Sequence, residues 1–155
     1  MLSQYIKKEN CHKCQFCCRF NYNNLWDVPL FTNEEKEKWE KKYSSITFKK
    51  MKTLWTPTLI VEGEYFNCPF LNHDGCILGK NKPFDCAIWP FYVMKKEGNI
   101  VLAKCNDCQT INEVSKESLM LSMNVHILQI KDYIDKFPDY IKPHISAYEV
   151  FFTYK

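Results

Sequence analysis

The chain has 155 residues, of which 46% are hydrophobic, 15% aromatic and 25% charged, and its formal net charge is +3. This length fits one domain with enough apolar residues for a hydrophobic core, so we predict a single domain over residues 1–155. No basic patch and no run of eighteen apolar residues occurs in the sequence, so neither nucleic acid nor a membrane is expected as a partner.

The first predicted regular element is a short polar helix that follows a cysteine-rich segment at residues 11–18. Residues 32–35 read Thr-Asn-Glu-Glu, which is typical of a capping box with Thr32 as the cap and Glu35 returning to it. We therefore expect a helix from there to about Tyr43. Its lysines and glutamates indicate a solvent-exposed face.

Two β-hairpins are predicted, one before and one after a loop-rich segment. Residues 57–67 are mostly apolar or β-favouring, with Gly63 at the turn. Residues 68–90 carry three cysteines, three prolines and two glycines, so we expect this segment to be shaped by its ligands. The second hairpin is expected over residues 91–105, with its turn at residues 97–99.

One long amphipathic helix is predicted from about residue 113 to residue 137. Apolar side chains recur there every three or four residues, which is the helical period. Pro138 is expected to end the helix, and the aromatic tail from residue 145 is expected to add a strand or to cover the core. The fold class is therefore predicted as α+β, a small metal-centred domain with short hairpins and one long packing helix. The apolar stripe consists of Met120, Met123, Ile127, Ile130, Ile134 and Phe137.

The nine cysteines are the strongest signal for function, and they indicate either a disulfide framework or a metal site. The first ten residues have no apolar run and no cleavage site of a secretory signal, so a cytoplasmic, reducing location is expected. An odd number of cysteines also suits disulfides poorly. The sequence therefore favours metal binding within residues 11–108, and the candidate ligands are Cys11, Cys14, Cys17, Cys18, Cys68, Cys76, Cys86, Cys105 and Cys108.

The first four cysteines are spaced C-x-x-C-x-x-C-C, and this spacing bears on the type of metal centre. Three cysteines at such intervals bind three corners of a 4Fe–4S cluster in bacterial ferredoxins, where a remote cysteine before proline completes the site. Cys68 stands before a proline here. Because neighbouring side chains tend to diverge, Cys17 and Cys18 are expected to serve a multinuclear centre or two adjacent centres. Zinc is the alternative, with the first C-x-x-C pairing with Cys105 and Cys108.

These motifs resemble the YkgJ-like cysteine-cluster family, whose members are described as zinc- or iron-chelating domains. The resemblance covers about residues 11–105, with CPFL…GCI at residues 68–77 and KPFDCAIWP at residues 82–90. It implies metal binding by the first eight cysteines, whereas Cys108 either joins the centre or is a buried thiol. Lys82, Leu78 and Ala87 depart from the family pattern. Flagellin lysine-N-methylases carry a similar block in a much longer chain, so the resemblance implies metal binding without methyl transfer.

Three functions remain open on this basis, and whether the chain is an enzyme is left undecided. The first is an iron–sulfur protein that transfers electrons or supports the chemistry of a protein partner. The second is a zinc-binding structural or chelating module that acts through protein contacts. The third is a metal-dependent enzyme with an open coordination position. His12 and His73 lie beside cysteines but are not counted among the ligands, because eight thiols are already present.

Overall fold

The computed structural model of the chain describes residues 2, 4–6 and 12–154. It contains both helices and strands, so the predicted α+β class is confirmed at that level. The chain divides into two compact units, which we name the N-terminal unit (Lys8–Ala87) and the C-terminal unit (Met1–Lys7 with Ile88–Lys155). The single domain over residues 1–155 stays a prediction. None of the described helices is long and apolar enough to cross a membrane.

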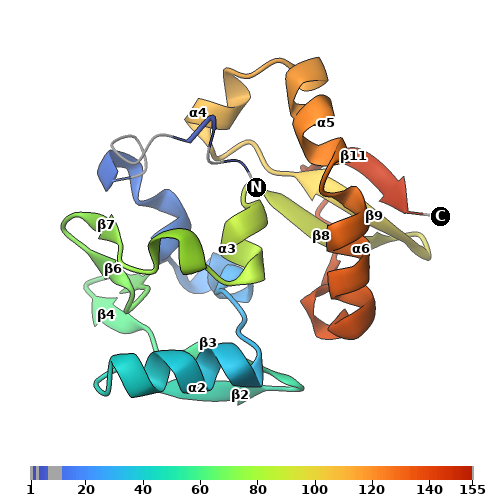
Figure 1. Cartoon of the computed structure of the whole chain (residues 1–155). Helices are drawn as coiled ribbons and strands as arrows, with labels where there is room; N and C mark the ends of the chain where they lie inside the picture. The colour runs from blue at the N-terminus through green and yellow to red at the C-terminus, as the bar shows by residue number, and fades with distance from the viewer. Residues whose placement is uncertain (1, 3, 7–11, 155) are drawn as a thin grey trace. The chain divides into compact units, whose positions relative to one another are not determined.

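The N-terminal unit is built from short elements (Figure 1). Its strands form a three-stranded antiparallel sheet in the order β1-β5-β4 and two separate hairpins, β2–β3 and β6–β7. In chain order the elements are η1 (Phe16–Cys18), β1 (Arg19–Phe20), η2 (Tyr22–Asp27), α2 (Asn33–Lys42), β2 (Phe48–Met51), β3 (Leu54–Pro57), β4 (Ile60–Glu62), β5 (Tyr65–Asn67), β6 (Leu71–Asn72), β7 (Gly75–Cys76), η3 (Gly79–Asn81) and α3 (Phe84–Ile88).

The predicted capping box and first hairpin are confirmed. The backbone N–H of Thr32 donates to Glu35 Oε2 over 2.8 Å, and the N–H of Glu35 donates back to Thr32 Oγ1 over 3.2 Å. These two bonds start α2, which ends before Tyr43 as expected. Gly63 has a φ of 61° in the turn between β4 and β5, a left-handed conformation that glycine adopts without steric cost. The β2–β3 hairpin was not predicted, because its turn uses Lys52 in that same left-handed region.

The C-terminal unit is organised by a four-stranded sheet in the order β10-β8-β9-β11. The predicted hairpin at residues 91–105 is confirmed as β8–β9, and the aromatic tail adds β11 antiparallel to β9. Strand β10 pairs in parallel with β8. The elements are β8 (Phe91–Lys96), β9 (Asn99–Lys104), α4 (Gln109–Asn112), α5 (Lys116–Asn124), α6 (Ile127–Lys136), η4 (Pro138–Tyr140), β10 (Lys142–Pro143) and β11 (Glu149–Tyr154).

The long helix predicted over residues 113–137 is replaced by α5 and α6. The chain turns at Val125 and His126, where the N–H of His126 donates to the carbonyl of Met123, three residues back, instead of continuing the α-helical ladder. Asparagine, valine and histidine at residues 124–126 all have low helix propensity, which makes this the weak point of the segment. Pro138 does stand just after the last helix, as predicted.

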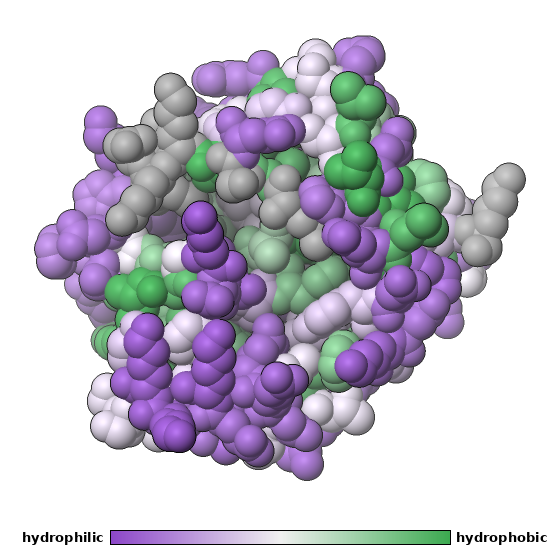
Figure 2. Space-filling view, in the orientation of Figure 1, coloured by the Kyte–Doolittle hydropathy of each residue, from purple (hydrophilic) through white to green (hydrophobic). Residues whose placement is uncertain are grey.

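The apolar stripe of these helices is only partly buried. Met123, Ile130 and Ile134 belong to the core, as the helical period predicts. The other members of the stripe, Met120, Ile127 and Phe137, are half-buried. Outside the stripe, Leu121, Val125 and Leu128 are more than two-thirds exposed, at 74%, 70% and 75%. Figure 2 shows hydrophobic surface over the region of α5 and the start of α6.

Candidate metal centre

Six of the nine candidate cysteines belong to the described part of the N-terminal unit, and they come from separate elements. Cys17 and Cys18 end η1, Cys76 ends β7, Cys68 directly follows β5, and Cys86 lies inside α3. Cys14 is exposed, Cys68 is buried, and the other four are half-buried. Cys11 lies outside the described residues. Free thiols are found at Cys14, Cys18, Cys68, Cys76 and Cys86.

Backbone pairing brings the first cysteine cluster next to Cys68. Strands β1 and β5 pair with Arg19 opposite Asn67. One residue beyond that pair, the N–H of Cys68 donates to the carbonyl of Cys18 over 2.9 Å. Two cysteines fifty residues apart in the sequence thus become neighbours through a two-residue strand.

The small β6–β7 hairpin adds Cys76 to the same region. Leu71 is paired with Cys76 across this hairpin, and the N–H of Leu71 donates to the carbonyl of Cys68 over 2.9 Å. A further bond joins the N–H of Ile77 to the carbonyl of Phe70 over 2.9 Å. Strand β7 begins at Gly75, directly after the turn, and its φ of 97° is a conformation that other residues rarely adopt.

Burial and neighbouring thiols raise the pKa of the two most enclosed cysteines of this unit, Cys68 and Cys86. The pKa of Cys68 is raised to about 12, mainly by burial; a backbone hydrogen bond from Phe70 lowers it, and the charges of Cys76 and Cys17 contribute to the rise. Burial also raises the pKa of Cys86 well above its usual value, with added contributions from Cys68, Cys17, Asp85 and Cys76. The charges of Cys17, Cys68 and Cys76 therefore belong to the electrostatic surroundings of Cys86.

The two adjacent cysteines hold their sulfurs close together. The Sγ atoms of Cys17 and Cys18 are 4.0 Å apart. Tetrahedral coordination with metal–sulfur bonds of about 2.3 Å places two sulfurs roughly 3.8 Å apart, so this separation is compatible with a single shared ion. The divergence expected of neighbouring side chains is therefore not seen at this pair.

Metal coordination is not already assembled in the part of the chain that the structure describes, where no three side chains of His, Cys, Asp or Glu are arranged to hold an ion. The donors nevertheless fit a soft metal centre, because thiols and imidazole nitrogens are the ligands of zinc and iron–sulfur sites. His12 adds to this fit. Its Nδ1 is buried and has no hydrogen-bond partner among the described residues, and its Cα lies 3.7 Å from the position that a Cβ on Gly75 would take.

An aromatic core surrounds Cys68. Cys68 belongs to a hydrophobic cluster that also contains Phe20, Phe31, Trp39 and Phe70, with Cys18 and Cys76 packed against it. Apolar surroundings keep water from a metal site and strengthen its electrostatic interactions. The same surroundings explain why burial is the first cause of the raised pKa of Cys68.

The remaining two candidates lie in the C-terminal unit. Cys105 and Cys108 are both buried there. The N–H of Cys105 donates to the carbonyl of Pro90 over 3.0 Å, and Cys108 is the residue that precedes α4. Their membership of the metal centre stays a prediction. His12, which the sequence analysis left out of the ligand set, is a further candidate because its buried Nδ1 has no hydrogen-bond partner among the described residues.

Comparison with known proteins gives no further assignment, because no protein-family model, no curated protein and no solved structure matches this chain. The YkgJ-like family therefore remains a resemblance of motifs.

Proposed function

We propose that this chain is a metal-binding cysteine-cluster protein, and that its metal is held by thiols of the N-terminal unit. The observation that supports this most directly is the backbone pairing that brings Cys18 and the hairpin of Cys76 to Cys68, and the charges of Cys17, Cys68 and Cys76 add to the effect of burial in raising the pKa of Cys86. Without a cation, burial and mutual repulsion both oppose the ionisation of Cys68 and Cys86. A cation among them turns the repulsion into attraction.

The chain's own residues would prepare the site in three ways. The β1–β5 pairing holds Cys18 beside Cys68, and the β6–β7 hairpin holds Cys76. The aromatic cluster around Phe70 excludes water. At neutral pH, burial keeps the thiols of Cys68 and Cys86 protonated, so metal binding must release their protons.

The C-x-x-C-x-x-C spacing favours an iron–sulfur cluster, which supplies one-electron transfer when bound. The chain would then pass electrons or support the chemistry of a protein partner. Two observations favour zinc as the second candidate. These are the 4.0 Å separation of Cys17 and Cys18 and the buried nitrogen of His12, since one tetrahedral ion accepts both sulfur and nitrogen ligands. In that case the protein is a structural or chelating module that acts through protein contacts.

Anaerobic purification followed by elemental analysis tests the proposal. Iron with acid-labile sulfide supports the first candidate, and zinc in a colourless protein supports the second. The variants Cys68→Ser and Cys86→Ser are expected to lose metal, because serine keeps the shape but removes the soft ligand. Ser45→Ala, an exposed change in the same unit, is the matched control and should retain it. Full occupancy in both cysteine variants, or no metal in the native protein after reconstitution, would refute the proposal.

A further inference from the structure

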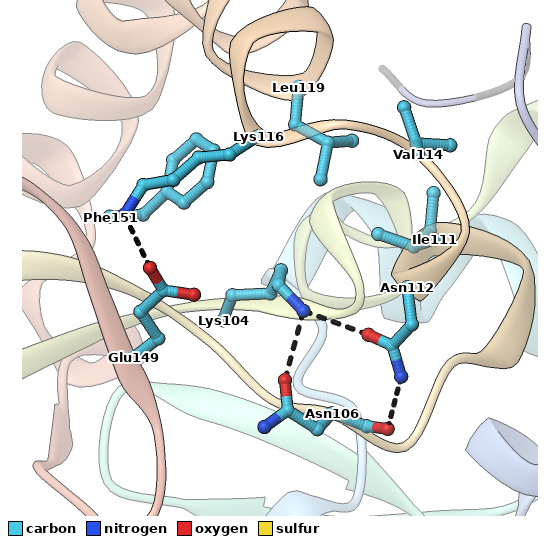
Figure 3. Close-up of a pocket in the computed structure, with 9 residues that line it drawn as sticks. All are labelled: Lys104, Asn106, Ile111, Asn112, Val114, Lys116, Leu119, Glu149 and Phe151. Atoms are coloured by element: carbon cyan, nitrogen blue, oxygen red, sulfur yellow. Dashed lines mark hydrogen bonds and ion pairs between the residues drawn. The ribbon is translucent and has the colours of Figure 1, made fainter.

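The C-terminal unit contains a cavity of about 280 Å³ (Figure 3). Its walls come from β9, β11 and the α4–α5 region. Strand β9 contributes Lys104, β11 contributes Glu149 and Phe151, and the helical segment contributes Asn112, Lys116 and Leu119. The volume lies near the lower end of the range for small-molecule sites, about 300–1,000 Å³.

Lys104 is the unusual residue of this cavity, because a lysine that is only 7% exposed normally pairs with a carboxylate. Its Nζ instead donates to Asn112 Oδ1 over 2.8 Å and to Asn106 Oδ1 over 3.0 Å. A third contact, to the carbonyl of Cys105, is 3.5 Å long and therefore weak. All three of these acceptors are neutral, so they solvate the ammonium without cancelling its charge.

The one acidic side chain among the residues given as lining the cavity is already engaged by another lysine. Glu149 stands opposite Lys104 in the β9–β11 register. Its carboxylate, however, forms an ion pair with Lys116 at 2.5 Å. Among the described residues that line the cavity, two lysines and one glutamate are the only charged side chains, which leaves one positive charge without a counter-charge. Burial of an unpaired charge is costly, so the cavity favours a bound monoanion.

The rest of the cavity wall is apolar. Leu119 and Phe151 are both buried, and Ile111 is fully buried beside them. The register of β11 shifts between Val150 and Phe152, which places Phe151 at a β-bulge. Bulges commonly re-aim a side chain next to a binding site, and here the re-aimed residue lines the cavity.

We propose that this cavity binds a small monocarboxylate with a short apolar chain. The carboxylate accepts a hydrogen bond from Lys104 in place of the weak contact to the Cys105 carbonyl. The apolar chain lies against Leu119 and Phe151. All residues of this site belong to the C-terminal unit, and none of them is a candidate metal ligand.

Titration of the full chain with hexanoate, followed by ¹⁵N–¹H NMR, tests this assignment. Saturable shifts are expected at the amides of the lining residues. Hexanamide has the same shape without the charge. It should bind about tenfold more weakly, because a charge contribution of about 1.4 kcal/mol corresponds to that factor. Lys104→Met should weaken hexanoate binding by about the same factor. Lys95→Met, which changes an exposed lysine outside the cavity, should leave binding unchanged.

Lys104→Met also removes the hydrogen bonds that Lys104 donates to Asn106 and Asn112, so a second variant tests binding without disturbing them. Glu149→Gln alters an exposed side chain and frees Lys116, so hexanoate binding should tighten severalfold while hexanamide binding stays the same. Equal affinity for hexanoate and hexanamide, absence of saturable shifts with hexanoate, or weaker hexanoate binding in Glu149→Gln would overturn the proposal. Tighter binding of inorganic phosphate than of hexanoate would overturn the apolar part of the assignment.

Discussion

The replacement of Phe70 by alanine is the sharpest test of how the cysteine segments are held. The side chain of Phe70 is fully buried. Its ring centroid lies 5.6 Å from that of Phe31, 6.1 Å from Trp39, 6.2 Å from Tyr43 and 6.2 Å from Phe48. Phe70 therefore connects α2 and the β2–β3 hairpin to the segment that carries the thiols.

The size of the effect follows from these contacts. Truncation of a buried phenylalanine to alanine costs about 3–5 kcal/mol of unfolding free energy, because transfer and cavity terms add. Each aromatic pair contributes roughly 0.5–1.5 kcal/mol beyond its buried area, and four ring neighbours are lost here. We therefore expect a loss near the upper end, about 4–5 kcal/mol. The unfolding free energy of a typical domain is only about 5–15 kcal/mol, so the N-terminal unit should become marginally stable.

Urea unfolding of the metal-free, reduced protein measures this loss, with near-UV circular dichroism as the readout. Phe70→Leu keeps most of the volume and should cost less than about 2 kcal/mol. Tyr22→Ala is a useful control, because Tyr22 is 78% exposed although its ring contacts Phe66. A loss below about 1.5 kcal/mol for Phe70→Ala would refute the view that this ring organises the unit.

Four further outcomes are expected. Thr32→Ala should destabilise the protein by about 1 kcal/mol in urea unfolding, because it removes the cap of α2. Burial raises the pKa of Glu35, so folding favours its protonated form and the unfolding free energy falls as pH rises through that pKa. The change in unfolding free energy caused by Glu35→Gln should therefore be more stabilising at pH 7 than at pH 4. An equal change at both pH values would contradict this. Gly98→Ala should lower the unfolding free energy by about 1–2 kcal/mol in thermal unfolding, because its φ of 85° is unfavourable for alanine. The space around Gly98 is open, so the added methyl group meets no neighbour and the cost is that of the backbone conformation alone. Metal addition at pH 7 in weak buffer should release protons from Cys68 and Cys86, and a constant pH would argue against their ligation.

Local signals in the sequence predicted those elements whose cause is local. The capping box at Thr32 and the hairpin turns at Gly63 and Gly98 depend on interactions within a few residues, and all three are present. The β2–β3 hairpin escaped prediction because its turn contains Lys52 where glycine or asparagine is the usual signal. The break at Val125 escaped because an apolar period continues across it and hides the weak helix propensity.

The candidate site was predictable in its residue types but not in its pairing. The cysteine spacing indicated that thiols converge, which stays a prediction; what the structure adds is the backbone pairing that joins Cys18 to Cys68. The bond from the Cys68 N–H to the Cys18 carbonyl depends on a strand of only two residues, which no periodicity reveals. Helix α3, which carries Cys86, is likewise too short to leave a recognisable pattern.

The adjacent pair Cys17 and Cys18 shows how the expected chemistry depends on the backbone. Neighbouring side chains point to opposite faces in an extended strand, and that rule led us to assign these cysteines to different metals. The two residues end a 3₁₀-helix instead, where successive side chains are separated by only about 120°. Rotation about the Cα–Cβ bonds then brings the sulfurs to 4.0 Å, which is close to the edge of a tetrahedral metal site. Adjacency is therefore compatible with two ligands for one ion, and the number of metals must be decided by stoichiometry and not by spacing.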